Sequence, residues 1–325
     1  MSATFLCAKD CTDQLWMQRG VMEKGKQGGM PTITQNLDNN SDIPLLTMND
    51  GRQIPQLGFG TFQLSGETCY NAVRAAITAG YRHIDTAAVY GNEEEVGRAI
   101  QDAIDAGEVT RDQLFVTTKL WNDSHDRVAG ALDASLERLG LDYVDLYLIH
   151  WLVEKIGMFA TAYRDMVTLR EQGKTASVGV CNSYPEVLDK MIEASGDTPA
   201  VNQIEVHPGF NQDELRAENA KRGILTESWS PLKQGQNLDN PAFQAIADAH
   251  GVTVAQVIIR WHIQRGDVVI PRSSKPERIR SNADVFGFQL TEDQMQRITA
   301  IEEGEAGRRG PNPHTFYEGT SLQKQ

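Results

Sequence analysis

Four side chains that can hold or move a proton stand at separate points of the 325-residue chain: Asp85, Tyr90, Lys119 and His150. Asp85, Lys119 and His150 end short apolar runs of the kind that forms buried β-strands. A free phenol has a pKa of about 10, and a cation about 4 Å away lowers it by at most about three units at an effective dielectric near 20. Tyr90 beside an Asp85–Lys119 ion pair would therefore donate and regain a proton near neutral pH.

This combination suits the reduction of a carbonyl group to an alcohol. His150 could direct the carbonyl oxygen towards the phenol, while Asp85 holds the ammonium group of Lys119. The hydride must come from a cofactor, because no side chain supplies one. Taken alone, each of these residues is more often structural, so the inference depends on all of them meeting at one place. An aldolase that forms a Schiff base on Lys119 is an alternative.

The elements that would bring these side chains together follow a regular alternation. Eight apolar segments predict strands at Gln56–Gly60, His83–Thr86, Leu114–Lys119, Val144–His150, Ser177–Cys181, Val201–Val206, Ile224–Trp229 and Val268–Pro271. Amphipathic segments predict helices at Glu67–Ala79, Asn92–Asp105, Arg127–Leu139, Phe159–Glu171, Pro185–Glu193, Asp213–Lys221 and Pro241–His262. This order predicts an α/β fold, a (β/α)8 TIM barrel, in which catalytic side chains gather at the C-terminal ends of the strands.

A doubly wound nucleotide-binding fold is the main alternative to the barrel. Its GxGxxG signature fails here, because Gln63 stands where the third glycine belongs after Gly58 and Gly60. The chain also has no HExxH metal motif, no GxSxG nucleophile motif and no P-loop. We therefore expect no metal site and no hydrolase-type serine.

The N-terminal region divides into two parts. Residues 1–42 have little apolar periodicity and predict a flexible, disordered tail, so the barrel domain is expected at 43–325. From Leu45 to Ile54 two short apolar segments flank Asn49-Asp50-Gly51, which predicts a β-hairpin because Asp-Gly supplies the positive φ angles of a tight turn.

Composition limits the setting and the partners. The formal net charge of −13 disfavours general binding to nucleic acid. No apolar run is long enough to span a membrane, and the N-terminus lacks the pattern of a secretory signal. Four cysteines without a CxxC pattern form no disulfide framework. We expect a cytoplasmic protein, a monomer that acts on a small molecule.

Five motifs together resemble the aldo-keto reductase superfamily, over residues 45 to about 317, and most closely its bacterial 2,5-diketo-D-gluconic acid reductase-like group. They read GYRHIDTAAVYGNE at 80–93, TKLW at 118–121, LIHW at 148–151, VNQIEVHP at 201–208 and VIPRS at 269–273. The resemblance implies a catalytic tetrad of Asp85, Tyr90, Lys119 and His150, with NADPH bound across the barrel mouth. It also leaves open an NADPH-binding regulatory or sensor subunit with little turnover.

The resemblance implies further site residues. Those expected around the nicotinamide are Asn182, Gln203 and Trp229, with Ser230 and Leu232 after them; Phe62, Trp121 and Trp151 are expected to line the substrate pocket. Four cations against one carboxylate lie between residues 272 and 280, and in the family this loop grips the adenosine 2′-phosphate. The residues matched there are Arg272, Ser273, Arg278 and Asn282.

Three positions depart from the family pattern. Cys181 replaces a usual Ser that holds the nicotinamide carboxamide, so one hydrogen bond is expected to be weaker or lost. Ser183 replaces a usual Phe, and Leu152 follows Trp151 where Pro is typical. These departures leave the predicted chemistry intact, but they make the substrate pocket unreadable from the sequence.

Overall fold

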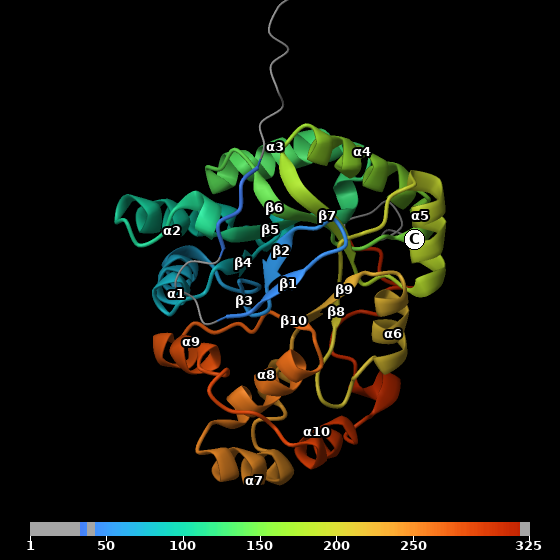
Figure 1. The fold of residues 1–325 in the computed structure, drawn as a ribbon. Helices are drawn as coiled ribbons and strands as arrows, with labels where there is room; N and C mark the ends of the chain where they lie inside the picture. The colour runs from blue at the N-terminus through green and yellow to red at the C-terminus, as the bar shows by residue number, and fades with distance from the viewer. Residues whose placement is uncertain (1–32, 38–42, 319–325) are drawn as a thin grey trace, which may run out of the picture. The chain divides into compact units, whose positions relative to one another are not determined.

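Eight parallel strands form one sheet in the computed structural model, which describes residues 33–37 and 43–318. In the order of their pairing they are β3 (Gly58–Gly60), β4 (His83–Asp85), β5 (Phe115–Leu120), β6 (Val144–Ile149), β7 (Thr175–Cys181), β8 (Val201–Glu205), β9 (Leu225–Trp229) and β10 (Val268–Val269). A parallel bridge between Leu57 and Val269 joins the first strand to the last. The predicted (β/α)8 barrel is confirmed (Figure 1).

Helices surround this sheet and bury its outer face. They are α1 (Gly66–Thr78), α2 (Glu93–Asp105), α3 (Val128–Leu139), α4 (Phe159–Glu171), α5 (Pro185–Ser195), α6 (Asp213–Lys221), α7 (Pro241–His250), α8 (Val254–Gln264), α9 (Pro276–Ala283) and α10 (Glu292–Thr299). Gly140 follows α3 with φ +63° and Gly223 follows α6 with φ +70°. Both angles lie in the left-handed region, where glycine ends helices at no steric cost.

One predicted helix is wrong. The segment Pro241–His262 forms two helices, α7 and α8, whose axes meet at 86°. Gly251 breaks the segment with φ +67°, and Thr253 then begins α8 with a capping box to Gln256. Among the described residues, no single helix is long and apolar enough to cross a membrane; α7 and α8 meet the length and composition test only as a bent pair.

A two-stranded hairpin closes the N-terminal end of the barrel, where Figure 1 shows it in front of the strands. Its strands are β1 (Leu45–Thr47) and β2 (Gln53–Pro55), and their pairing confirms the predicted hairpin. Within Asn49-Asp50-Gly51 only Gly51 has a positive φ, so the turn is not the two-residue Asp-Gly type. Met48 and Ile54 pack with Phe115 in the same buried apolar cluster, which makes the hairpin an apolar plug.

The packed chain begins upstream of the expected boundary at residue 43. Leu37 is buried in the apolar cluster beside the hairpin, and the Asn36 amide donates to the Asp112 carbonyl at 2.8 Å. The prediction of an unpacked tail through residue 42 is therefore wrong for residues 33–37, where one buried leucine anchors the backbone. Residues 1–32 and 38–42 lie outside the described part of the chain.

Candidate active site

The barrel mouth holds a buried ammonium group between a carboxylate and a phenol. Asp85 is the last residue of β4 and Lys119 lies near the end of β5, so neighbouring parallel strands bring them together. The Nζ atom of Lys119 donates to Asp85 Oδ1 at 2.6 Å and to the Thr86 carbonyl at 2.9 Å. The same Nζ lies 3.4 Å from the Tyr90 hydroxyl. Lys119 is fully buried, so this charge is held almost without water.

Tyr90 is positioned by a tightly bonded turn after β4. It ends the short 3-10 helix η1 (Ala88–Tyr90), and Gly91 follows it with φ +63°. The buried Asn92 then donates from Nδ2 to the carbonyls of Thr61 and Leu64, at 2.9 and 2.8 Å. Asn92 thus ties the loop after β3 to the loop after β4, and this bonding fixes the phenol beside Lys119.

Burial shifts the pKa of Tyr90 in the direction opposite to the one expected from the sequence. Loss of water raises the pKa of Tyr90 above its ordinary value, although Lys119 acts to lower it. The expected net fall towards neutrality is therefore wrong, because desolvation outweighs one nearby cation. Tyr90 is a neutral phenol at pH 7 and can donate its proton. Burial opposes the charge on Lys119, but Asp85 and Tyr90 outweigh it and the pKa of Lys119 rises.

Histidine and aromatic rings form the wall next to this group. His150 follows β6, and its ring centroid lies 5.6 Å from that of Tyr90 and 5.2 Å from that of Trp121. Burial, followed by the charge on Lys119, holds the pKa of His150 well below its usual range, so the imidazole is neutral. Phe62 packs against Tyr90 at 5.1 Å, and its side chain is 52% exposed at the mouth.

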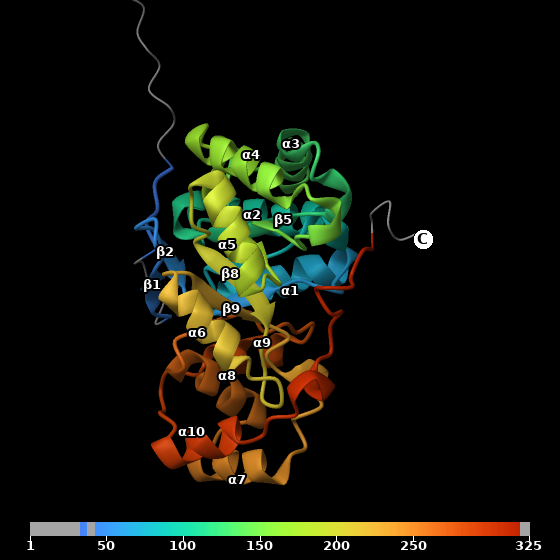
Figure 2. The same cartoon turned by 90° about the vertical axis from the view of Figure 1, so that its right-hand side faces the viewer.

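One aromatic residue of this wall was missed by sequence reasoning. Phe316 lies 4.4 Å from Trp151 and 6.2 Å from Trp121 between ring centroids. It comes from the C-terminal segment, which lies at the opposite end of the barrel from the hairpin (Figure 2). A lone Phe in a segment without periodicity gives no signal of such a place. The structure thus gathers the three predicted pocket residues, Phe62, Trp121 and Trp151, and adds a fourth.

The C-terminal segment is anchored by a buried carboxylate. Glu205 ends β8, and its oxygens accept the backbone amides of Arg309 at 2.6 Å and Gly310 at 2.9 Å. His207 Nε2 lies 3.1 Å from the same carboxylate. A Cβ atom built on Gly310 would lie 2.2 Å from the Trp229 ring, so only glycine fits there. Glu205 therefore sets the position of the segment that carries Phe316.

The residues expected around a nicotinamide meet at the ends of β7, β8 and β9. The Trp229 indole donates to Asn182 Oδ1 at 3.0 Å, and Asn182 Nδ2 donates to the His150 carbonyl at 3.2 Å. Asn182 and Ser230 have φ +55° and +51°, a conformation that costs energy for residues other than glycine and that clusters at functional sites. Leu232 packs partly buried against two apolar clusters.

Two of the departures from the family pattern have structural consequences. Cys181 is fully buried, and its thiol lies 3.9 Å from Gln203 Oε1, which is a weak hydrogen bond. Leu152 is buried, and the next residue, Val153, has φ +45°. A β-branched residue in this region is a clear outlier, so the loop after β6 is strained at Val153.

The basic residues near α9 are exposed and lack carboxylate partners. Arg272 donates to Gln63 Oε1 at 3.2 Å, while Lys275 and Arg278 are exposed at the start of α9. Among the described residues, no ion pair involves Arg272, Lys275, Arg278 or Arg280. Ser273 accepts from the Lys275 amide at 3.1 Å, and Asn282 is buried on α9. Unpaired arginines of this kind fit a phosphate group.

The comparison with known proteins agrees with this geometry. Residues 56–303 match the model of the aldo/keto reductase family. The chain belongs to the aldo/keto reductase family. It is 50% identical over 276 residues to an aldo-keto reductase of Mycobacterium sp. (strain JLS), covering 84% of this chain and 98% of that one. It is 46% identical over 274 residues to methylglyoxal reductase DkgA of Escherichia coli (strain K12), covering 84% and 98%.

Solved structures of aldo/keto reductases share the fold. The aldo-keto reductase AKR2E4 of Bombyx mori, solved in complex with NADP, superimposes with a TM-score of 0.77 at 38% identity, covering 82% of this chain and 94% of that one. The resemblance seen in the motifs is confirmed, and the protein is an oxidoreductase of carbonyl groups. Its relatives are named as reductases, which gives no support to the regulatory alternative.

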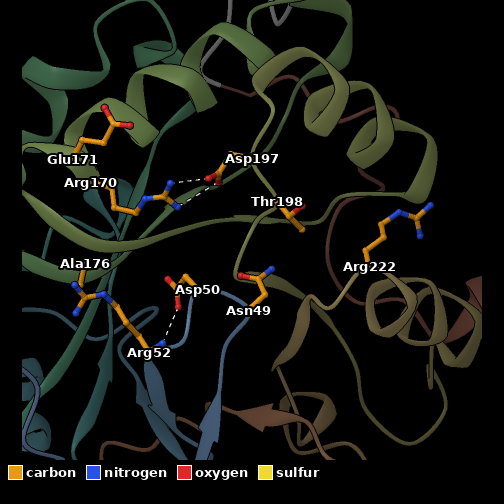
Figure 3. A pocket seen from close by; sticks show the side chains of 9 residues that line it. All are labelled: Asn49, Asp50, Arg52, Arg170, Glu171, Ala176, Asp197, Thr198 and Arg222. Atoms are coloured by element: carbon orange, nitrogen blue, oxygen red, sulfur yellow. Dashed lines mark hydrogen bonds and ion pairs between the residues drawn. The ribbon is translucent and has the colours of Figure 1, made fainter. Parts of the chain in front are cut away.

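This aldo/keto reductase also has a polar cavity beside the hairpin. It has a volume of about 610 Å³ and is lined by Asn49, Asp50, Arg52, Arg170, Glu171, Ala176, Asp197, Thr198 and Arg222 (Figure 3). Arg170 pairs with Asp197 at 2.6 Å, as the dashed lines in Figure 3 show. Asp50 accepts from Ser177 Oγ on β7 at 2.6 Å, which joins the hairpin to the barrel. None of the predicted catalytic residues lines this cavity.

Proposed function

We propose that this protein reduces the carbonyl group of a small aldehyde or ketone, with Tyr90 as the proton donor. The observation that carries the proposal is the position of the Lys119 ammonium, 2.6 Å from Asp85 Oδ1 and 3.4 Å from the Tyr90 hydroxyl. A neutral phenol next to a fixed cation can give its proton to a developing alkoxide, because the cation stabilises the phenolate that remains.

The roles of the four residues follow from their contacts. Tyr90 and the neutral His150 orient the carbonyl oxygen, and Tyr90 protonates it. Lys119 stabilises the phenolate, and Asp85 keeps the lysine charged and in place. Phe62, Trp121, Trp151 and Phe316 keep water away from the reacting carbon. A Schiff base on Lys119 is disfavoured, since a buried, ion-paired ammonium is not a nucleophile.

NADPH, when bound, supplies the hydride. The residues present fit this group, because the mouth combines cations without carboxylate partners with a partly exposed indole and an amide oxygen that accepts only a weak bond from a thiol. The residues proposed to hold it are Asn182, Gln203, Trp229, Ser230 and Leu232 at the nicotinamide side, and Arg272, Ser273, Arg278 and Asn282 at the 2′-phosphate side. Lys275 and Arg280 add positive charge beside them.

Methylglyoxal is the substrate proposed for the first assay. Relatives at 46–47% identity are named methylglyoxal reductase, and the rings of Tyr90 and His150 lie 5.6 Å apart between centroids, beside aromatic side chains. The test is the loss of near-ultraviolet absorbance of NADPH when protein and methylglyoxal are mixed. We expect turnover with methylglyoxal and none without a carbonyl compound. Absence of turnover with methylglyoxal and with a panel of small aldehydes would overturn the proposal.

The proposed setting is the cytoplasm, where the protein acts as a monomer. All four residues of the proposed tetrad come from one chain, so no second copy is needed to complete them. The net charge of −13 agrees with a protein that is no general binder of nucleic acid.

A further inference from the structure

A carboxyl group without a cation of its own lies inside the barrel beneath the proposed tetrad. Glu227 on β9 is fully buried. Its Oε2 accepts from Gln203 Nε2 at 2.9 Å, and the same nitrogen donates to Asp85 Oδ2 at 2.8 Å. The other oxygen, Oε1, has no hydrogen-bond partner among the described residues and lies 3.5 Å from His83 Nε2. The amide of Gln203 therefore joins two buried carboxyl groups.

The charges around Glu227 do not balance if both carboxyl groups are ionised. The titratable groups that face it are His83 and Asp85 on β4, Lys119 on β5, Cys181 on β7 and, beyond the pair, Tyr90. Lys119 is paired with Asp85, and burial lowers the pKa of His83 to about 3, so His83 carries no charge. Burial, followed by the charge on Asp85, raises the pKa of Glu227 to about 8. Glu227 therefore holds its proton to a higher pH than an ordinary carboxyl group does.

The hydrogen bonds to Asp85 and Glu227 also fix the orientation of the Gln203 amide. Its Nε2 atom donates one hydrogen to Asp85 and the other to Glu227. Rotation of the amide by 180° would place its oxygen against the Asp85 carboxylate. The carbonyl oxygen of Gln203 is then turned towards Cys181, whose thiol reaches it only at 3.9 Å. Only this oxygen remains for a ligand at the mouth.

We propose that Glu227 is a positioning residue for carbonyl reduction: its uncharged carboxyl group holds the Gln203 amide and leaves the buried cluster with one ammonium and one carboxylate. This inference rests on the proposed function. Ionisation of Glu227 adds a second negative charge close to Asp85, Lys119 and Tyr90. That charge raises the pKa of the phenol further and makes Tyr90 a weaker acid, so turnover falls as Glu227 loses its proton.

The pH dependence of turnover tests the proposal. Reduction of methylglyoxal by NADPH is measured from pH 6 to 10 with saturating substrates, for the unmodified enzyme and for Glu227→Gln. We expect the unmodified enzyme to lose activity with a midpoint near pH 8 and Glu227→Gln to lack this step, because an amide cannot ionise. The matched control is Glu214→Gln, a surface change on α6, which should follow the unmodified profile. Superimposable profiles for Glu227→Gln and the unmodified enzyme would overturn the proposal.

Infrared spectroscopy gives a measurement that does not depend on turnover. The unmodified enzyme should show the C=O stretching band of a protonated carboxyl group at pH 6.5, which disappears by pH 9.5 and is missing from Glu227→Gln. If Glu227→Gln does not fold, Glu227→Asp should shift this band. A band that is absent at pH 6.5, or that neither variant changes, would overturn the proposal. Should the enzyme oxidise no NADPH at all, the proposed function fails, while this titration still decides whether Glu227 holds a proton.

Discussion

Two arginines at the hairpin end of the barrel and two at its mouth differ in how their charge is balanced. In the cavity beside the hairpin, Arg170 pairs with Asp197 at 2.6 Å and Arg222 pairs with Asp189 at 2.7 Å. At the mouth, Arg272 and Arg278 are exposed and form no ion pair with any described residue. The unbalanced charge of Arg272 and Arg278 is what the proposed phosphate site requires, whereas the paired arginines Arg170 and Arg222 tie elements together.

The buried side chains at the two ends of the barrel also differ in polarity. Met48 and Ile54 fill the hairpin end with apolar groups, whereas Asp85, Lys119 and Glu227 fill the layer beneath the mouth with buried charge and acid. Burying such groups destabilises a fold unless they are paired. At the mouth end, these buried groups are the ones to which the chemistry is assigned by the proposed function.

A large effect on turnover, second only to loss of the Tyr90 hydroxyl, is expected from removal of the buried cation. Lys119→Met should lower turnover with methylglyoxal by about 10² to 10⁴, because the phenolate of Tyr90 loses its stabilising charge. In the direction of alcohol oxidation, the apparent pKa of the catalytic base should rise. Steady-state kinetics across pH measures both quantities. A variant with near-normal turnover and an unmoved pKa would show that Lys119 is only structural.

The basic cluster should decide the choice of cofactor. We expect the unmodified enzyme to prefer NADPH to NADH at least tenfold, about 1.4 kcal/mol. Arg278→Ala should weaken NADPH binding and barely change NADH binding, and the preference should shrink as salt rises. Quenching of tryptophan fluorescence measures both dissociation constants.

Arg170→Ala is the matched control for this prediction at the other end of the barrel. It removes a paired arginine, so it should lower the melting temperature by a few degrees and leave the cofactor preference unchanged. Equal dissociation constants for NADPH and NADH in the unmodified enzyme would contradict the prediction that the unpaired arginines at the mouth bind the 2′-phosphate.

A smaller effect is expected from the anchor of the C-terminal segment. Glu205→Gln leaves one of the amides of Arg309 and Gly310 without its charged acceptor, which loosens the segment that carries Phe316. The KM for methylglyoxal should rise several-fold while kcat changes little, because the tetrad is untouched. Steady-state kinetics at saturating NADPH separates the two constants. A fall in kcat at unchanged KM would place the effect of Glu205 elsewhere.

The smallest effect concerns stability and pH. Burial raises the pKa of Glu227 from 4.5 to about 8 in the folded protein, so the folded state takes up a proton between these values. The stabilisation from this proton is complete below about pH 4.5 and is lost as the pH rises through about 8. The melting temperature of Glu227→Gln minus that of the unmodified protein should therefore be larger at pH 9 than at pH 5. Thermal unfolding followed by circular dichroism measures both melting temperatures. A difference between the two proteins that stays the same from pH 5 to pH 9 would contradict this prediction.

Much of this architecture was readable from the sequence. The alternation of strands and helices predicted the barrel, and the ends of the predicted strands placed Asp85, Lys119 and His150 on one rim. The break at Gly251 was missed, although the spacing of Thr253 and Gln256 carries a capping-box signal. The packing of residues 33–37 against the barrel was not predicted, because one buried leucine gives no periodic pattern.

Other parts of the site depend on long-range packing. Phe316 reaches the mouth only through the clamp of Glu205 on a distant segment, and no local pattern predicts that contact. The pKa of Tyr90 depends on how far surrounding atoms exclude water, which spacing along the chain does not show. Glu227 gave a usable signal, since a carboxylate inside an apolar strand segment has to be buried, but its partner Gln203 comes from another strand.

The most direct test of the account is turnover by Tyr90→Phe, measured together with its affinity for NADPH. The change removes one hydroxyl group and leaves the ring contacts with Phe62 and His150 in place. We predict that reduction of methylglyoxal falls by at least about 10² to 10⁴, because the proton donor is gone, while the dissociation constant for NADPH stays within a few-fold. A Tyr90→Phe enzyme that binds NADPH normally and reduces methylglyoxal at a near-normal rate would contradict the central claim.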